Sequence, residues 1–264
     1  MSKSSPELYS TREAAELLGV SPTTLKRWAD EGLLPAEKTL GGHRRFSRSA
    51  LLAVRRGDEV GDWLEQLLSG GPAAALQSAL LGEFADRGSW QEVAELLGRV
   101  LRTLGEWWAA GETSVATEHY ASERLRRALA VCADSIPVAK NAPTCLLATA
   151  SNESHTLGLS LAEVVFRELG WHCDWIGAPT PTNLLILALD EREPDLLVMS
   201  ASSCCDDPQV VAAEHETVAS ACEERGIPLV VGGEGAWPEN PRYGNRVRAF
   251  RELTEIPHPT SRSK

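Results

Sequence analysis

The chain shows two kinds of hydrophobic pattern, one before and one after about residue 143. Between residues 10 and 133, apolar residues recur three or four positions apart, which predicts amphipathic helices. From residue 145 onward, short continuous apolar runs alternate with helical patterns, which predicts buried parallel strands joined by helices. We therefore expect a multidomain protein that is helical in its first half and α/β in its second half.

The first helices have clear start signals. Ser10-Thr11-Arg12-Glu13 has the form of a capping box, and Ser21-Pro22 has the form of an N-cap followed by proline at the first helical position. Gly19 lies between the two predicted helices and permits a tight turn. In the second helix Leu25 and Trp28 face inward, which leaves four polar residues outside: Thr23, Thr24, Lys26 and Arg27. Two short helices joined in this way indicate a helix-turn-helix.

A basic hairpin follows these two helices. Gly41-Gly42 is suited to a hairpin tip, His43-Arg44-Arg45-Phe46 places two guanidinium groups beside one anchoring aromatic ring, and a third helix begins near Ser47. This order predicts a winged helix-turn-helix. Residues 8–56, above all "REAAELLGVSPTTLKRWADEGLLP" and "GGHRRF", resemble the DNA-binding domain of the MerR family. The resemblance implies that the second helix enters the major groove and the wing contacts phosphate, with DNA contacts from Thr23, Thr24, Lys26, Arg27, His43, Arg44 and Arg45.

The middle segment predicts a bundle of about four helices. Residues 55–72 look like a polar linker with a short helical stretch at 63–68, and three helical patterns then fill residues 73–133. Trp107 and Trp108 are consecutive, so they cannot both face one core well. Glu118-His119 follows beyond a short turn, at the same end of the bundle. Taken alone, these residues fit either a core tryptophan with surface Glu and His or a contact to a flat ligand.

The last segment predicts an open parallel sheet. Strands are expected at 145–150, 172–176, 196–200 and 228–231, and helices at 157–169, 183–191 and 207–225. A fifth strand is harder to place, and our candidate is 247–250, which could also be helical. In such sheets ligands bind beyond the carboxyl ends of the strands.

Three short motifs fall at these strand ends. They are Glu153-x-His155-x-x-Gly158, Ser200-x-Ser202 and Gly232-Gly233, and no G-x-G-x-x-G sequence accompanies them, so a dinucleotide is not expected. A histidine beside a carboxylate suits metal ligation through one ring nitrogen. The set resembles the cobalamin-binding domain of methionine synthase and corrinoid proteins, except that Ser202 stands where that family has Leu or Thr. The resemblance implies that His155 is the lower ligand to cobalt and Glu153 orients it, while the nucleotide tail contacts Gly158, Ser200, Ser202, Gly232 and Gly233.

The order of the three parts resembles the CarH/LitR family of light-sensing repressors, over residues 8 to about 250. Trp108, nine residues and then Glu118-His119 match the W-x9-E-H signature of that family, and Val115 falls where the family has a small apolar residue in the upper pocket. The resemblance implies adenosylcobalamin, an operator-binding tetramer in the dark, and release after light breaks the cobalt–carbon bond. One departure is Ala109, where light-sensing members can carry a His that ligates cobalt after photolysis. His119 could replace that ligand, or water could remain there.

Charge and composition agree with this interpretation. Residues 1–56 hold ten Lys/Arg and six Asp/Glu, although the net charge of the whole chain is −11. A basic first domain on an acidic chain fits a protein whose N-terminal part alone meets phosphate. No apolar run is long enough for a membrane span, and the six cysteines form no C-x-x-C pair, so we expect a cytoplasmic protein with reduced thiols.

We expect three domains: 1–62, a winged helix-turn-helix; 63–142, a helical bundle over the upper face of the corrinoid; and 143–264, a flavodoxin- or Rossmann-like cobalamin-binding domain. Operator DNA and copies of the same chain are the expected partners, and no enzymatic activity is expected. Two alternatives remain. One is a regulator that is independent of corrinoid or that senses haem or another tetrapyrrole. The other is a corrinoid methyl carrier, which would not carry residues 8–56 or the upper-face pair Trp108 and Glu118.

Overall fold

The computed structural model describes residues 8–39 and 41–259, without the side chains of residues 48, 49 and 52–58. The chain divides into two compact units that meet between Glu65 and Gln66, and each is described by itself. Within the described residues, no helix has the length and apolar composition that crossing a membrane requires.

The first unit is a small helical domain with a three-stranded sheet. Ser10 caps α1, and the reciprocal hydrogen bonds with Glu13 confirm the predicted capping box. Ser21 caps α2 through the Thr24 amide, as predicted. The strand β1 was not predicted, because three residues are too short to show a period; it pairs with β3, which lies in the middle of the order β1-β3-β2. The elements are β1 (Leu8–Ser10), α1 (Thr11–Leu17), α2 (Pro22–Asp30), β2 (Glu37–Lys38), β3 (Arg44–Ser47) and α3 (Arg48–Leu68).

The helix α3 corrects one prediction. It runs without a break to Leu68, so the residues expected to form a polar linker are helical. The run from 55 to 68 contains charges and two glycines but no proline, and a polar run without proline can continue a helix. The chain leaves the helix at Gly70 and Gly71, both of which have positive φ.

The second unit begins with the helical bundle. Its helices α4 (Ala73–Arg87), α5 (Trp90–Ala109) and α6 (Val115–Ser135) occupy the three predicted helical segments. On α5 the apolar residues Val93, Leu97, Val100 and Leu104, which lie three or four positions apart, are buried, whereas Leu101 and Trp107 are half-buried and Trp108 is exposed. Ser114 is the N-cap of α6 and accepts a hydrogen bond from the Thr117 amide.

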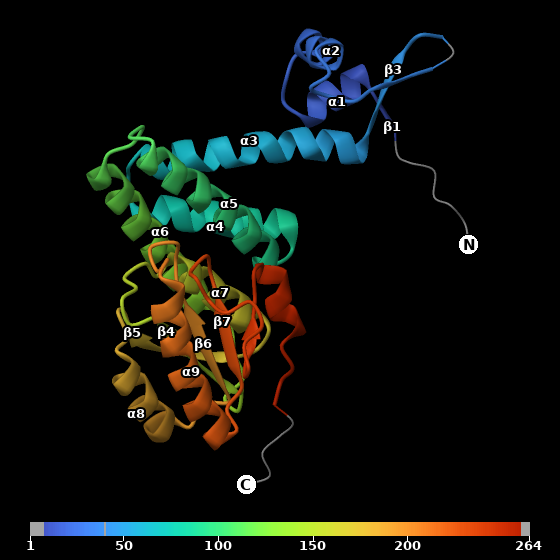
Figure 1. Ribbon diagram of the computed structural model, residues 1–264. Helices are drawn as coiled ribbons and strands as arrows, with labels where there is room; N and C mark the ends of the chain where they lie inside the picture. The colour runs from blue at the N-terminus through green and yellow to red at the C-terminus, as the bar shows by residue number, and fades with distance from the viewer. Residues whose placement is uncertain (1–7, 40, 260–264) are drawn as a thin grey trace. The chain divides into compact units, whose positions relative to one another are not determined.

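The remainder of the second unit is a five-stranded parallel sheet in the order β5-β4-β6-β7-β8. The helix α7 covers one face of this sheet, and α8 and α9 cover the other (Figure 1). The elements are β4 (Thr144–Thr149), α7 (Leu157–Glu168), β5 (His172–Gly177), α8 (Thr182–Arg192), β6 (Leu196–Ser200), α9 (Pro208–Arg225), β7 (Leu229–Gly232), β8 (Asn245–Arg246) and the 3-10 helix η1 (Phe250–Glu255).

The fifth strand therefore exists, but it precedes the predicted position. The strand β8 is Asn245–Arg246, and after the Val247 amide donates to the Val231 carbonyl the chain leaves the sheet. Phe250 begins η1, and its ring approaches α5 where Gly98 leaves room for it. An apolar residue in this segment thus packs against a helix of the bundle, which a strand period could not reveal.

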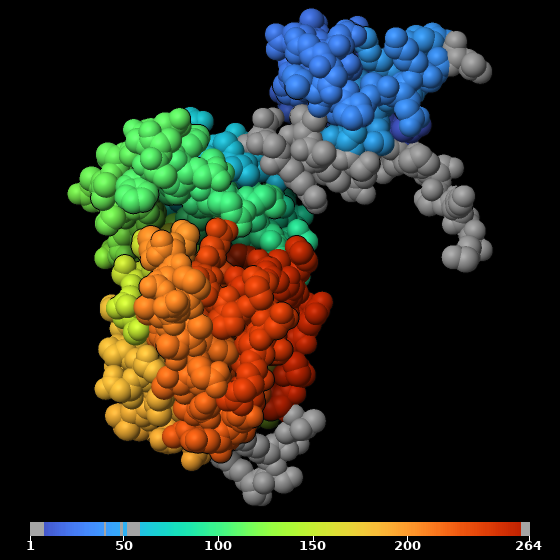
Figure 2. Space-filling model, viewed as in Figure 1, coloured from blue at the N-terminus to red at the C-terminus, as the bar shows by residue number. Residues whose placement is uncertain are grey.

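The bundle and the sheet belong to the same compact unit and contact each other directly. Glu168 at the end of α7 accepts the Trp90 amide at 2.9 Å and so binds the first turn of α5. On the same helix Arg102 pairs with Glu234, at 2.7 Å, just after β7. Figure 2 shows the green segments of the bundle resting on the orange and red segments of the α/β part. The end of β7 and α5 are therefore linked.

Candidate functional site

The predicted sheet residues gather where the strand order reverses. The chain goes from β4 outward to β5 and then returns to β6 on the other side of β4, so β4 and β6 flank the switch point of the sheet. Glu153 and His155 follow β4, and Ser202 follows β6. Ligands of open α/β sheets bind in the crevice at this point, beyond the carboxyl ends of the strands.

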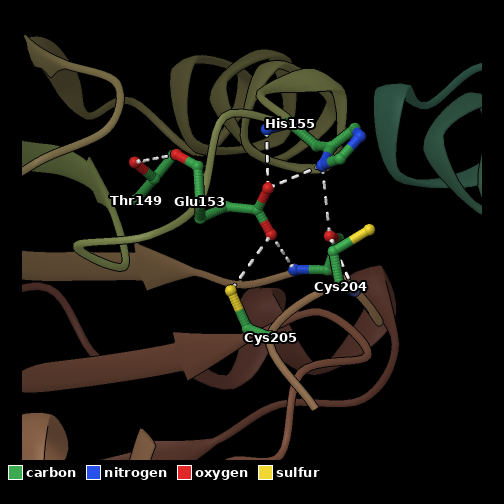
Figure 3. A network of polar contacts seen from close by, with 6 residues as sticks. Thr149, Glu153, His155, Cys204 and Cys205 are labelled. Atoms are coloured by element: carbon green, nitrogen blue, oxygen red, sulfur yellow. Dashed lines mark hydrogen bonds and ion pairs between the residues drawn. The ribbon is translucent and has the colours of Figure 1, made fainter. Parts of the chain in front are cut away.

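A buried carboxylate fixes the histidine of this group. Glu153 is 1% exposed, and its Oε1 accepts from the backbone N–H of His155 at 2.6 Å and lies 2.7 Å from the Nδ1 of the same residue (Figure 3). The His155 side chain is 58% exposed. Because Nδ1 faces a carboxylate, the favoured tautomer carries its proton there and leaves Nε2 as a lone-pair donor.

The second oxygen of Glu153 binds the loop after β6. Its Oε2 accepts from the Ser202 amide and from the Cys205 thiol, whose Sγ lies at 3.7 Å. Ser202 Oγ lies 3.3 Å from His155 Nδ1. Burial raises the pKa of Glu153, but the hydrogen bonds from Ser202 and His155 together lower it by more than burial raises it. The pKa of Glu153 is therefore below its ordinary value. The carboxylate is thus held in its charged, accepting form.

Two neighbours of this network were missed from the sequence. Thr149 Oγ1 donates to the Glu153 carbonyl at 3.0 Å, and Cys205 is buried beside the carboxylate. Burial raises the pKa of the Cys205 thiol to about 11, which keeps it a donor. The signal for Cys205 is weak in the sequence, because it looks like any buried thiol until β6 is placed next to β4.

A second buried carboxylate holds the start of the same loop. Glu214 on α9 accepts from the Ser151 amide at 2.8 Å and from the Thr182 hydroxyl at 3.2 Å. It was not predicted, because its helix lies more than fifty residues away in sequence. Unlike Glu153, it makes no contact with His155 in the part of the chain described.

The glycine motifs mark places where the backbone lies close to its neighbours. Gly233 has a φ of +88°, and a Cβ there would collide with the Ala201 carbonyl oxygen. A Cβ on Gly158 would lie 3.6 Å from Ser200 Oγ, so the first turn of α7 approaches the end of β6. These two glycines therefore lie close to Ser200 and Ala201 at the end of β6.

The residues predicted for the upper face form a separate group at the junction of α5 and α6. Trp108 is 49% exposed and Val115 is exposed. Glu118 accepts from Ser122 Oγ at 2.5 Å and lies 2.8 Å from His119 Nδ1. Among the described residues, no hydrogen bond or ion pair joins this group to Glu153 or His155. The indole is therefore accessible to a ligand, whereas each oxygen of Glu118 already has one partner on α6.

The predicted DNA contacts lie in the first unit. Thr23, Lys26 and Arg27 are exposed on α2, whereas Thr24 is half-buried with its Oγ1 2.8 Å from the hydroxyl of its N-cap, Ser21. His43 is exposed at the hairpin. Arg44 instead forms an ion pair with Asp30 at the end of α2, a contact that was not predicted.

The sheet offers a single nitrogen donor, which would fit a metal whose other ligands belong to a bound group. His155 offers one nitrogen, Nε2, for which the described residues contain no hydrogen-bond partner, while Glu153 fixes the other nitrogen. One imidazole nitrogen suits an axial position on a metal whose remaining positions are occupied by the ligand that carries it. The exposed indole of Trp108 suits the flat surface or substituent of such a ligand.

Two known families match parts of the chain that precede β4. The family described as a helix-turn-helix domain matches residues 8–58, and the family described as a B12 binding domain matches residues 51–133.

Among curated proteins, the HTH-type transcriptional repressor CarA of Myxococcus xanthus is 27% identical over 255 residues, which cover 85% of this chain and 86% of CarA. The repressor CarH of the same organism is 25% identical over 279 residues, covering 86% of this chain and 89% of CarH. Among solved structures, a cobalamin-binding protein from Desulfitobacterium hafniense aligns with 15% identity and a TM-score of 0.36 over 74% of this chain and 96% of that one.

Proposed function

Because the chain belongs to the CarA- and CarH-like family of helix-turn-helix repressors, we propose that it represses transcription as an adenosylcobalamin-dependent, light-responsive oligomer. The two repressors and the matches to a helix-turn-helix domain and a B12 binding domain support a cobalamin-binding transcription regulator. The adenosyl form, the light response and the oligomer are our proposal. The observation that carries the proposal is the buried contact of Glu153 with Nδ1 of an exposed His155, which leaves Nε2 free as a ligand.

The lower face of the corrinoid would be held by His155. Glu153 keeps the imidazole in one tautomer and one orientation, and Ser202 and Cys205 in turn keep the carboxylate in place. Partners of this kind usually change metal affinity by about 10- to 100-fold. We propose that Gly158, Ser200, Ser202, Gly232 and Gly233 accept the nucleotide tail, because two of these glycines leave room for a close approach of the backbone.

The upper face would be read by the bundle. Bound adenosylcobalamin would supply a cobalt–carbon bond that light can break. We propose that Trp108 packs on the adenosyl group beside Val115, and that Glu118 accepts a hydrogen bond from its ribose hydroxyls. His119 lies next to Glu118 and is the candidate for the second cobalt ligand, since position 109 holds alanine where light-sensing members can carry a histidine.

DNA would be bound by the first unit. Thr23, Lys26 and Arg27 are exposed on α2, and they are the candidates for contacts in the major groove. Thr24 is a weaker candidate, because its hydroxyl lies beside the N-cap. We propose that His43 and Arg45 on the wing contact phosphate, and that the dark form assembles as a tetramer. No catalytic step is assigned to the chain.

The experiment is an absorption titration of purified wild type with adenosylcobalamin in darkness, followed by green light and size-exclusion chromatography. The wild type is expected to show the spectrum of a corrinoid with histidine as the lower ligand, and to change both spectrum and size after illumination. His155→Ala should lose the histidine-dependent spectrum, whereas His172→Ala, which changes an exposed histidine on β5, should keep it. Equal spectra for the two variants would exclude His155 as the ligand, and a wild type that keeps one size would exclude the light switch.

A further inference from the structure

The two wing arginines lie on opposite faces of β3. Side chains alternate along a strand, and Phe46 is fully buried in the core of the first unit, so Arg44, two residues earlier, shares its inward face. Arg45 lies on the other face, and its charge lowers the pKa of Glu13, an effect smaller than that of the Ser10 hydrogen bonds. Both arginines were predicted from the sequence to contact phosphate, but on the strand Arg44 and Arg45 have different neighbours.

The guanidinium of Arg44 is already engaged. It forms an ion pair and hydrogen bond with Asp30 Oδ1, and the side chain of Arg44 is 23% exposed whereas that of Asp30 is 64% exposed. Asp30 is the last residue of α2, the helix that carries the proposed major-groove contacts. The contact therefore joins the wing strand to the end of this helix, across fourteen residues of sequence.

Asp30 does not stabilise α2 by its position alone. A carboxylate at the C-terminal end of a helix meets the negative end of the helix dipole, which disfavours it. A positive partner offsets this cost, and Arg44 supplies one from outside the helix. A phosphate would therefore have to share this guanidinium with Asp30 or displace the carboxylate.

We propose that Asp30 and Arg44 form a brace that sets the angle between α2 and the wing, and that Arg45 rather than Arg44 is the phosphate contact of the wing. Asp30 and Arg44 are then positioning residues, which act on DNA affinity through the geometry of the wing. The inference rests on the proposed DNA binding of the first unit. It gives Asp30 a role in DNA binding, although a carboxylate is not expected to contact phosphate directly.

The test uses the salt dependence of DNA binding, because each phosphate contact adds about 0.9 to the magnitude of the slope of log K against log salt. The full-length protein, loaded with adenosylcobalamin and kept in darkness, would be titrated with a fluorescein-labelled duplex of random sequence at several salt concentrations. Arg45→Ala is expected to lose about 0.9 from the slope. Arg44→Ala and Asp30→Asn are expected to lose about two- to fivefold in affinity at every salt concentration, with the slope unchanged.

A double-mutant cycle separates a brace from two independent effects. If the pair acts as one unit, Asp30→Asn combined with Arg44→Ala should cost no more than either change alone. Asp30→Asn keeps the shape of an exposed side chain, so it tests the pair even if Arg44→Ala fails to fold. The brace is wrong if Arg44→Ala lowers the slope as Arg45→Ala does, if Asp30→Asn leaves the affinity unchanged or raises it, or if the double change is additive. A wild type whose binding is absent or independent of salt would instead contradict the proposed DNA binding itself.

Discussion

Replacing Glu153 by Gln should weaken cobalamin binding. The carboxylate accepts four contacts, two from His155 on Oε1 and two, from Ser202 and Cys205, on Oε2. Glutamine has one acceptor oxygen, so either orientation turns an NH₂ group toward one pair of donors. With the NH₂ toward Ser202 and Cys205, a half-buried amide and a buried thiol are left without an acceptor, at a cost of about 1–3 kcal/mol in stability. With the NH₂ toward Nδ1, the ring must move its proton to Nε2, the atom that would bind cobalt.

Both orientations therefore disturb the ligand nitrogen or the loop that supports it. We expect the affinity for adenosylcobalamin to fall by about 10- to 100-fold, or about 1.4–2.8 kcal/mol. The assay is an absorption titration in darkness at a temperature where urea unfolding shows that the variant is folded. Dissociation constants would be compared with the wild type on the same day and in the same buffer.

The matched control is Glu214→Gln. Glu214 is also buried and holds the start of the same loop through Ser151 and Thr182, but two of its three donors are hydroxyls that can turn to accept from an amide. This variant should keep its cobalamin affinity within about twofold, which is less than 1 kcal/mol. The reasoning about His155 fails if the two variants lose affinity equally, because general order of the loop would then explain the result, or if Glu153→Gln binds like the wild type.

Three further predictions concern other parts of the account. Gly233→Ala should lower the free energy of unfolding more than Gly226→Ala. Both glycines have positive φ, which costs alanine about 1–2 kcal/mol, but only at Gly233 does the new Cβ collide with the backbone, which adds about 1–3 kcal/mol. Equal urea midpoints for the two variants would contradict this prediction. Trp108→Ala should still bind hydroxocobalamin, but its preference for adenosylcobalamin should fall by about tenfold or more, because an aromatic contact and its burial are worth about 2 kcal/mol or more. Parallel titrations with the two cobalamins would measure this preference, and an unchanged preference would make Trp108 a structural residue. Of the six thiols, Cys204 alone is exposed, so the native protein should react with one equivalent of Ellman's reagent quickly and with the rest only on unfolding, and two or more fast thiols would be inconsistent with the fold.

Much of the sheet could be predicted because its signals are local. A continuous apolar run such as Leu196–Ser200 is short and is bounded by polar residues, so β6 was placed at its observed limits. The contact between Glu153 and His155 was also expected, because two residues separated by one position after a strand lie close together whatever the rest of the fold does.

Contacts between distant segments could not be predicted in this way. The role of Cys205 depends on β6 lying next to β4, and the role of Glu214 depends on α9 reaching the loop after β4. The strand alternation at Arg44 and Arg45 was readable from the buried position expected for Phe46, but the partner Asp30 was not, because it requires the end of α2 to face the wing. The continuity of α3 was missed since charge alone does not end a helix.

The central claim is that cobalamin and light control DNA binding by this chain. It is tested most directly by fluorescence anisotropy with a duplex that the dark, adenosylcobalamin-loaded protein has selected from a random-sequence pool. Affinity would be measured for the protein alone, with adenosylcobalamin in darkness, and with adenosylcobalamin after green light. We predict tight binding in the second condition and binding at least about tenfold weaker, or about 1.4 kcal/mol, in the other two. Equal affinity in all three conditions would contradict the account.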